Sequence, residues 1–408
     1  MSAPNVCRGC GAPLDDVFLD LGLSPLANAY PGPDELALPE TFYPLCAYVC
    51  ARCFLVQLPA HADPETIFGE YAYFSSYADT WLDHARTFAT AAIAARKLDQ
   101  RSLVIELASN DGYLLRWFRE AGIPVLGIEP ARNVAEVARE AGIETIAEFF
   151  GTELAGRIVA DGRRADLLVA NNVLAHVPDL HDFVGGIALL LAPHGVASIE
   201  FPHVMRLLER TQYDTIYHEH FSYFSLLALE PVFAAHDLRV VEVEELPTHG
   251  GSLRIVVGRG AERPSVETIH RAERAAKLGE IATYRRFNER VRENKNALLR
   301  FLLAASERRE RVVAYGAPAK GNTLLNFAGV RADLIEYTVD RSRYKQGRYL
   351  PGSRIPIASP ERLLADEAPD YLLVLPWNLL DEIRQQMHEV SRRGTRFVVA
   401  IPELAVLS

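Results

Sequence analysis

The chain has 408 residues, enough for more than one hydrophobic core, and its 24% charged and 49% hydrophobic residues are ordinary for globular proteins. Its net charge of -10 argues against binding along a nucleic-acid backbone, which depends on clustered lysine and arginine. No apolar run approaches the roughly 20 residues that span a bilayer, and the N-terminus lacks the pattern of a signal peptide. We therefore expect a cytoplasmic protein with no nucleic-acid or membrane partner.

All five cysteines lie in the first 53 residues, and four of them form two C-x-x-C pairs, Cys7 with Cys10 and Cys50 with Cys53. Each pair can form a knuckle whose thiolates face one ion, and two knuckles make a closed tetrahedral zinc site. The 39 residues from Gly11 to Val49 exceed the usual spacing and imply an inserted loop. Four ligands leave no open position, so we expect structural zinc. Disulfide pairing is the alternative, which a reducing cytosol disfavours.

A tyrosine-rich segment, residues 68–77, follows the cysteines and contains Tyr71, Tyr73 and Tyr77. One interpretation is a packed linker between two domains. The other is an aromatic lid whose phenols hydrogen-bond a sugar or a cofactor. The apolar spacing after this segment predicts a helix over residues 79–98.

An apolar strand at residues 104–107 leads into a loop of small and polar residues and then into an amphipathic helix. This strand–loop–helix order begins a doubly wound α/β unit, in which ligands bind at the carboxyl ends of the strands. A second strand follows and ends in Glu129, an acid that can accept hydrogen bonds from a ribose diol. Ala108 and Asn110 occupy positions where a pyrophosphate-binding loop has glycine, so the loop suits an adenosine ligand without phosphates. A strand and turn with no ligand is the alternative.

The third strand of this unit, residues 166–170, ends in polar residues that include Asn171, Asn172 and His176. Their position beside the first loop favours a binding role. The alternative is that the asparagines only form a turn and that the histidine has its hydrogen bonds satisfied at the start of a helix. Further elements are predicted as a helix at 179–191 and strands at 195–201, 238–243 and 252–257. The last two strands form a terminal antiparallel hairpin.

The densest chemical cluster is Tyr217, His218, Glu219 and His220. A neutral imidazole is a natural proton acceptor near pH 7, a neighbouring carboxylate can fix its tautomer, and a phenol can stabilise an enolate oxygen. A metal site from the two histidines and Glu219 is the second interpretation, although alternation in an extended chain would put Glu219 on the opposite face. A structural loop is the third.

The C-terminal third begins with a charged, helical pattern over residues 262–310 and continues with a strand at 311–316. The loop Gly316–Gly321 and a helix at Asn322 follow, and backbone donors and Lys320 at a helix N-terminus suit a phosphate. Asn322 replaces the lysine of a Walker motif, so ATP hydrolysis is not expected. Further strands are predicted at residues 334–339, 371–375 and 396–401. We expect a second Rossmann-type domain, which either helps to hold a nucleotide sugar or is a scaffold without a ligand.

The stretch from Glu106 to Tyr113 resembles the first motif of class I S-adenosylmethionine (SAM) methyltransferases. This resemblance implies SAM as the cofactor. The SAM-binding residues that it implies are Glu106, Ala108, Asn110, Gly112, Glu129 and Asn171.

The order of all these motifs resembles the nucleotide-sugar C-methyltransferases of deoxysugar pathways, such as those of tylosin and tetronitrose. In that family a 4-keto sugar on a nucleoside diphosphate loses a proton beside its carbonyl, and the enolate takes a methyl group from SAM. The resemblance implies that His220 is the base and that Tyr217 and Glu219 act with it. The upstream catalytic tyrosine that it implies is Tyr71, Tyr73 or Tyr77, of which we favour Tyr71. The substrate-binding residues that we expect are Asn172, His176, Tyr73, Tyr77, Lys320 and Asn322.

We therefore expect an α/β chain of three parts: a zinc-binding module at residues 1–70, a class I SAM methyltransferase domain with a Rossmann-like fold at 71–260, and a Rossmann-like domain at 261–408. The expected enzyme is a SAM-dependent sugar C-methyltransferase that acts on C-3 of a dTDP-4-keto-deoxysugar, as a monomer or small homo-oligomer. One alternative is C-5 methylation or another nucleotide. Others are an NAD-dependent sugar-nucleotide oxidoreductase and a zinc-bearing nucleic-acid-binding protein.

Overall fold

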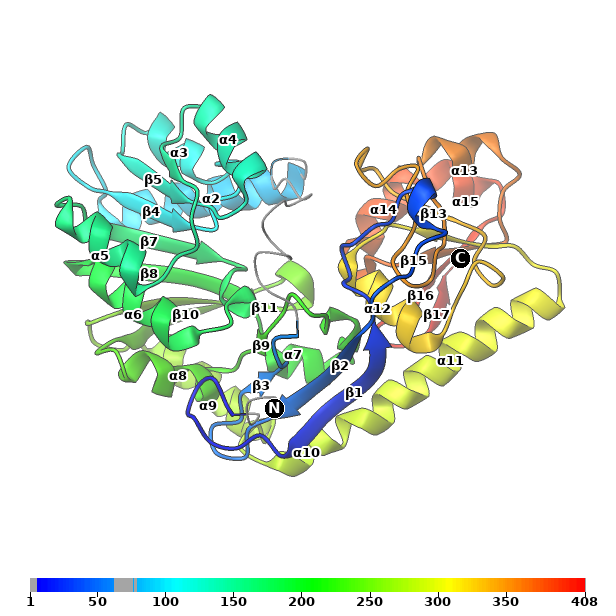
Figure 1. Cartoon of the computed structure of the whole chain (residues 1–408), viewed down its shortest axis with the longest axis horizontal. Helices are drawn as coiled ribbons and strands as arrows, with labels where there is room; N and C mark the ends of the chain where they lie inside the picture. Colours follow the sequence, from blue (N-terminus) through cyan, green and yellow to red (C-terminus); the bar gives the residue numbers. More distant parts are fainter. Residues whose placement is uncertain (1–5, 62–75, 77–78, 408) are drawn as a thin grey trace.

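A computed structural model describes residues 6–61, 76 and 79–407 of the chain. Three β-sheets organise these residues. Figure 1 shows a small N-terminal sheet at the base, a seven-stranded sheet with its helices on one side and a six-stranded sheet on the other. None of the described helices is long and apolar enough to cross a membrane.

The N-terminal sheet has the strand order β1-β2-β3-β9, and all its pairs are antiparallel. Its last strand comes from the middle of the chain, where Ser222 pairs with Gln57 and Tyr223 with Val56. The motif at residues 217–220 is therefore tied directly to the cysteine-bearing module. The strands are β1 (Asp16–Ser24), β2 (Tyr43–Val49), β3 (Val56–Gln57) and β9 (Ser222–Tyr223).

The seven-stranded sheet has the order β10-β11-β8-β7-β4-β5-β6. Its strands β6, β5, β4, β7 and β8 run parallel, and the predicted antiparallel hairpin β10–β11 closes one edge. The strands are β4 (Val104–Leu107), β5 (Val125–Ile128), β6 (Thr145–Ile146), β7 (Ala165–Asn171), β8 (Leu191–Pro202), β10 (Arg239–Leu246) and β11 (Ser252–Gly258).

Helices cover this sheet because its central strands are buried on both faces. Asp179 caps α6 by accepting hydrogen bonds from the backbone N–H groups of His181 and Asp182. The helices are α2 (Asp79–Arg96), α3 (Leu115–Glu120), α4 (Arg132–Glu140), α5 (Thr152–Ala160), α6 (Leu180–Leu190), α7 (Val204–Glu209) and α8 (Leu226–Ala234).

The six-stranded sheet has the order β14-β13-β12-β15-β16-β17 and is parallel except for β17. The strand of this sheet that comes first along the chain, β12, leads into α12 through a short loop, as β4 leads into α3 in the seven-stranded sheet. The strands are β12 (Val312–Tyr315), β13 (Thr338–Val339), β14 (Ile357–Ala358), β15 (Tyr371–Val374), β16 (Arg396–Val399) and β17 (Ala405–Leu407), and the helices are α12 (Ala319–Ala328), α13 (Glu361–Ala365), α14 (Leu380–Gln386) and α15 (His388–Arg392). The predicted α/β fold class is confirmed.

The charged segment between the two larger sheets forms helices α9 (Pro264–Ala275), α10 (Ile281–Arg285) and α11 (Phe287–Glu307). Phe287 stacks on Phe18 of β1, with 5.2 Å between ring centroids, so α11 begins on the N-terminal sheet. Figure 1 shows α11 running from there along the C-terminal sheet. The helical segment that the sequence pattern predicted therefore joins these two parts of the molecule.

Residues 213–224 lie where the three sheets meet. The 3-10 helix η4 (Tyr213–Thr215) opens this segment and contacts α12. Thr323 of α12 donates a hydrogen bond to the carbonyl of Ile216, and β9 closes the segment within the N-terminal sheet. All three parts therefore position the predicted catalytic motif.

Candidate active site and metal centre

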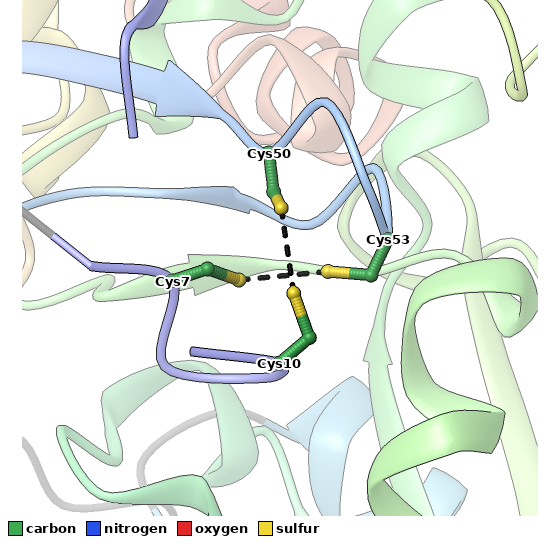
Figure 2. Close-up of side chains that lie close together, drawn as sticks. All are labelled: Cys7, Cys10, Cys50 and Cys53. Carbon is green, nitrogen blue, oxygen red and sulfur yellow. Dashed lines mark hydrogen bonds between the residues drawn. The ribbon is translucent and has the colours of Figure 1, made fainter. Parts of the chain in front are cut away.

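The four cysteines of the two C-x-x-C pairs converge on one point (Figure 2). Their sulfur atoms lie within 4.8 Å of one another, and the Cys7–Cys53 and Cys10–Cys50 sulfurs are 3.5 Å apart. Thiolates that each lie about 2.3 Å from one zinc ion have separations of this order. All five cysteines of the chain are free, so no disulfide forms. The donor set fits one structural zinc ion.

Each of the two knuckles is closed by a backbone turn of the same kind. The N–H of Gly11 donates to the carbonyl of Cys7 at 2.8 Å, and the N–H of Phe54 donates to that of Cys50 at 2.9 Å. Gly11 and Phe54 both have left-handed backbones, with φ of 71° and 60°. Glycine adopts this conformation freely, whereas phenylalanine adopts it only where the surrounding structure imposes it. The surrounding structure therefore imposes the backbone conformation at the end of the second knuckle.

The predicted SAM loop follows β4, and its backbone is left-handed at Ala108, Asn110 and Gly112, with φ of 53°, 50° and 77°. The two residues that replace glycine thus adopt the conformation that glycine would. Glu129 stabilises the loop, because its carboxylate accepts the N–H groups of Asn110 and Ala131, each at 2.9 Å. Each carboxylate oxygen has two acceptor sites, so one remains on each oxygen for a ribose hydroxyl.

Several buried polar atoms beside this loop have no hydrogen-bond partner among the described residues. They are Glu106 Oε2, Asp111 Oδ1, Asn171 Oδ1 and both side-chain polar atoms of Asn172. They belong to the carboxyl ends of β4 and β7 and the loops that follow. Burial also raises the pKa of Glu106 well above its usual value. Because buried polar groups are normally paired, these residues fit a ligand with both donors and acceptors, such as SAM.

His220 has a defined tautomer. Its Nδ1–H donates to the carbonyl of Thr215 at 2.9 Å, which leaves the lone pair on Nε2. The hydroxyl of Tyr217 lies 2.9 Å from that Nε2 and donates to it, with 4.0 Å between the ring centroids. Burial first, and the nearby His176 second, hold the pKa of His220 well below its usual value. The imidazole is therefore neutral at pH 7.

His176 stands edge-on to His220, with 4.8 Å between ring centroids and an interplanar angle of 65°. It lies in the 3-10 helix η3 (Leu174–His176), and its Nδ1–H donates to the backbone carbonyl of Glu219 at 2.8 Å. Burial lowers its pKa to about 4, and this hydrogen bond opposes the shift. The segment that follows β7 and the 217–220 motif are thereby joined.

The expectation that the Glu219 carboxylate fixes the tautomer of its neighbour is wrong, because the carbonyl of Thr215 does this. The loop is not extended, and Glu219 instead faces Asn28, whose amide donates to both carboxylate oxygens at 2.7 and 2.9 Å. Burial raises the pKa of Glu219 to about 7, against the opposing effects of Asn28 and Lys345.

The alternative metal site at residues 218–220 is also excluded by this geometry. The ring of His218 faces Tyr43, with 5.8 Å between centroids, and its Nε2 lies 3.2 Å from the carbonyl of Pro44. Three consecutive side chains thus point to three different surroundings. Within the described part of the chain, the four-cysteine cluster is the one group of three or more metal-binding side chains close enough to share an ion.

Lys320 brings the C-terminal unit to this site. Its Nζ donates to Asn378 at 2.7 Å and lies 4.6 Å from the ring centroid of Trp377, whose indole N–H donates to Asp214 at 2.7 Å. Burial raises the pKa of Asp214 to about 6, and Lys320 opposes the shift. The charge of Lys320 also lowers the pKa of His220. Lys320 therefore lies beside the segment that carries the motif, because Trp377, over which it stands, is hydrogen-bonded to Asp214 of η4.

The other predicted substrate-binding residue of this unit, Asn322, is placed differently. It is 1% exposed, and its amide donates to the carbonyl of Ala27 at 2.6 Å, which links α12 to the N-terminal module. One backbone donor of the preceding loop, Ala317, is bound to Asp340. Lys345, which the sequence did not single out, donates to the carbonyl of Ala317 at 2.7 Å and lies over the ring of Tyr30.

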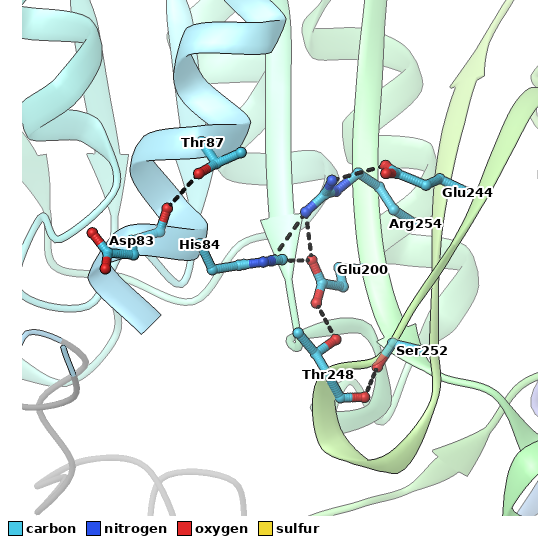
Figure 3. A network of polar contacts seen from close by, with 8 residues as sticks. All are labelled: Asp83, His84, Thr87, Glu200, Glu244, Thr248, Ser252 and Arg254. Carbon is cyan, nitrogen blue, oxygen red and sulfur yellow. Dashed lines mark hydrogen bonds and ion pairs between the residues drawn. The ribbon is translucent and has the colours of Figure 1, made fainter. Parts of the chain in front are cut away.

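A buried charge network lies at the end of β8 (Figure 3). Glu200, whose side chain is fully buried, accepts hydrogen bonds from Arg254 at 3.0 Å and from Thr248 at 2.8 Å, and its other contact is His84 at 3.0 Å. Burial alone would raise the pKa of Glu200, but these partners together lower it. The network joins α2, β8, β11 and the hairpin loop η5 (Thr248–Gly250).

Sequence reasoning missed this network because its members are scattered along the chain.

The predicted lid tyrosines Tyr71, Tyr73 and Tyr77 lie outside the described residues. Their described neighbour Ser76 donates its backbone N–H to Asp111 in the SAM loop at 3.2 Å. Ser76 itself therefore contacts the SAM loop.

The sequence matches three family profiles that follow one another along the chain. A zinc binding domain covers residues 7–68, a methyltransferase domain covers 81–243, and a C-methyltransferase C-terminal domain covers 247–402. The zinc profile contains all four clustered cysteines, and the methyltransferase profile contains the loop after β4.

One curated relative matches over nearly its full length. The C-methyltransferase NovU of Streptomyces niveus is 40% identical over 412 residues, which cover 98% of this chain and 96% of that protein. An S-adenosylmethionine-dependent methyltransferase from Clostridium acetobutylicum aligns with 46% of this chain and 95% of its own, at 12% identity and TM-score 0.36. Magnesium protoporphyrin IX methyltransferase from Synechocystis with bound SAM aligns with 50% of this chain and 100% of its own, at 14% identity and TM-score 0.35.

Proposed function

Because this chain belongs to the SAM-dependent C-methyltransferase family, we propose that it methylates C-3 of a dTDP-linked 4-keto-deoxysugar in the cytoplasm. The observation that carries this proposal is the edge-on contact of His220 with His176, in a segment that Trp377 and α12 of the C-terminal unit also bind. Such a site offers a base and a cation to a substrate that reaches both Rossmann-like units. The order of motifs along the chain supports the choice of a nucleotide sugar.

His220 is the proposed base. Its neutral Nε2 takes the proton from the carbon beside the keto group, and the C–H electrons form an enolate. That carbon then forms a bond to the methyl carbon of SAM as the methyl–sulfur bond breaks. The hydrogen bond to the carbonyl of Thr215 keeps Nδ1 protonated and stabilises the imidazolium that forms.

Tyr217 decides the path of that proton, because its hydroxyl donates to the lone pair that must receive it. In a direct path the phenol turns to the enolate oxygen and donates there, which is the kind of stabilisation that oxyanion sites provide. In a relayed path the phenol passes its own proton to Nε2 and takes the proton from carbon. Tyr217→Phe separates the two, since deuterium exchange at the sugar carbon survives only in the direct path.

The C-terminal unit is proposed to hold the nucleotide diphosphate. Lys320 reaches the start of the segment through Trp377 and Asp214, and the charge of Lys345 lowers the pKa of the nearby Glu219. A diphosphate bound by these cations would extend its sugar toward the histidines. Asn172 and His176 are proposed to contact that sugar, and Glu106, Ala108, Asn110, Gly112, Glu129 and Asn171 to contact SAM.

Product analysis tests the proposal. The enzyme is incubated with SAM that carries a 13C-labelled methyl group and with a panel of dTDP-4-keto-deoxysugars, and the product is examined by NMR. We expect a new carbon–carbon bond at C-3 of at least one sugar. A methyl group at C-5, or on oxygen, would overturn the proposed position. The same panel on UDP instead of dTDP tests the nucleotide.

A further inference from the structure

Arg8 lies inside the first cysteine knuckle, between Cys7 and Cys10, and its side chain contacts the strand that follows the catalytic motif. One guanidinium nitrogen, Nη1, donates to the carbonyl of Phe221 and to Ser222 Oγ, the latter at 3.1 Å. The other, Nη2, donates to the carbonyl of Leu58 at 2.6 Å. One side chain thus links the knuckle, the chain after β3 and strand β9.

Phe221 is the residue that follows His220, and both of its backbone groups are fixed. Its N–H donates to the carbonyl of Ala175 at 2.7 Å, and its carbonyl accepts from Arg8 and from the N–H of Leu58 at 2.9 Å. Ala175 in turn precedes His176. The peptide group that follows His220 is therefore hydrogen-bonded to the peptide group that precedes His176. Arg8 binds the carbonyl at the other end of Phe221.

Gln57 connects the same strand to a predicted zinc ligand. Its side-chain N–H donates to Cys7 Sγ at 3.1 Å, and its side-chain oxygen accepts the backbone N–H of Arg8 at 3.0 Å. Gln57 also pairs with Ser222 across β3 and β9. The position of the first knuckle and that of β9 therefore depend on each other.

We propose that Arg8 is a positioning residue through which the first zinc knuckle holds His220 and His176 in their working geometry. The inference rests on the proposed role of His220 as the base. A guanidinium suits this task because its planar fork donates to several carbonyls at once, which the single ammonium of lysine does not reproduce. Misplacing a catalytic group by about 1 Å lowers a rate by about 10²-fold, so even a small movement of β9 would matter.

The second knuckle supplies a matched control. Arg52 lies between Cys50 and Cys53 as Arg8 lies between Cys7 and Cys10, but its side chain is exposed. A substitution at Arg52 changes the charge of a knuckle without touching β9. It therefore separates an effect on the zinc module in general from an effect on the motif.

The experiment compares Arg8→Gln, Arg52→Gln and His220→Asn as zinc-loaded, full-length proteins. Three quantities are measured: zinc content, the affinity for S-adenosylhomocysteine, and the rate of deuterium exchange beside the sugar carbonyl. For Arg8→Gln we expect one zinc per chain, wild-type affinity, and exchange and kcat lowered about 10- to 100-fold with little change in KM. Arg52→Gln should match the wild type in all three.

Exchange by Arg8→Gln at the wild-type rate would overturn the positioning role, and so would an equal loss in Arg52→Gln. Should Arg8→Gln fail to fold, Arg8→Lys takes its place, since it keeps the charge and loses the fork. Lysine that restores wild-type exchange would also overturn the proposal. Exchange that persists in His220→Asn would instead refute the base itself, so the two failures are distinguishable.

Discussion

At the scale of residues, the tautomer and the pKa of His220 are set by groups from different parts of the chain. The carbonyl of Thr215 lies five positions earlier along the chain, whereas His176 comes from η3 and Lys320 from the C-terminal unit. Together with burial they give a neutral imidazole with a defined tautomer. A base of this kind is useful near pH 7 because it needs no prior deprotonation.

Local patterns predicted some of these residues and missed others. Tyr217 and His220 could be singled out because they are three positions apart and carry recognisable chemistry. Thr215 acts through its carbonyl, which every residue has, so no side-chain pattern identifies it. Asn28 is far from Glu219 in sequence, and only the fold brings them together.

The first prediction concerns Glu129. Glu129→Ala should weaken the binding of SAM and S-adenosylhomocysteine by about 1.5–3 kcal/mol, the scale of hydrogen bonds to a charged group. It also frees the N–H groups of Asn110 and Ala131, so the loop after β4 loses its support. Titration calorimetry measures the affinity, with the exposed Glu136→Ala on α4 as the control. Unchanged affinity in Glu129→Ala would refute the assignment.

The second prediction concerns the pH dependence that Glu219 confers. Burial raises its pKa from 4.5 to about 7, so the folded protein holds this proton more tightly than the unfolded chain does. The resulting stabilisation is fully present below pH 4.5 and is lost as the pH rises to about 7. Glu219→Gln does not titrate, so the wild type should lose up to about 3 kcal/mol of unfolding free energy relative to it across that range. Urea unfolding at a series of pH values measures this, and a constant difference would contradict the assignment.

At the scale of elements, the hairpin loop η5 joins the methyltransferase sheet to the C-terminal unit. Gly250 packs so closely on Trp377 that a Cβ at this position would lie 2.5 Å from the indole ring. The carbonyl of Gly250 accepts from Arg210 and Gln212, both at 2.9 Å. His249, between these contacts, has a left-handed backbone with φ of 52° and stands 5.7 Å from the ring of Trp81 on α2. The loop is held from several sides.

The third prediction tests the Glu200 network that anchors this loop. Thr248→Val keeps the shape of the side chain but removes the hydrogen bond to a buried carboxylate. The unfolding free energy should fall by about 1.5–3 kcal/mol, because Glu200 Oε1 is left without that donor. Thr268→Val is the control, because Thr268 is exposed. Its hydroxyl donates to the neutral carbonyl of Pro264 at 3.2 Å and accepts from Arg271 only at 3.5 Å, so the substitution should change stability by less than about 0.5 kcal/mol. Equal effects of the two substitutions would contradict the role of the network.

Elements with a continuous apolar pattern were predicted well, and short or irregular ones were not. Strands β4, β5 and β7 are buried runs bounded by loops, so their position follows from the sequence. Strand β9 has two residues and exists only because β3 lies beside it. The expected strand at 334–339 is reduced to Thr338–Val339, and α12 begins at Ala319, before the predicted start at Asn322.

At the scale of the whole molecule, the three parts are joined through the segment 213–224. Trp377 and Thr323 bind its first half, and β9 binds its second half to the cysteine module. This explains how a structural zinc site and a remote Rossmann-like unit bear on one motif. The division of the chain at residues 70 and 260 stays a prediction.

The fourth prediction concerns the metal. Reduced, chelator-washed protein should contain one zinc per chain by elemental analysis, because four clustered thiolates bind the ion tightly. Cys10→Ser should lower both zinc content and unfolding free energy. Cys46, the fifth cysteine, lies on β2 outside the cluster, so Cys46→Ser should change neither zinc content nor metal-dependent stability. Folded protein without metal and with four freely titrating thiols would contradict the zinc site.

The most direct test of the account is proton exchange separated from methyl transfer. The enzyme is loaded with S-adenosylhomocysteine in place of SAM and incubated in deuterium oxide with the dTDP-4-keto-deoxysugar that it methylates. Loss of the C-3 proton signal is followed by NMR. The wild type should exchange this proton, and His220→Asn should exchange it about 10²–10⁴-fold more slowly while binding S-adenosylhomocysteine with unchanged affinity. Exchange in His220→Asn at the wild-type rate would contradict the central claim that His220 generates the enolate.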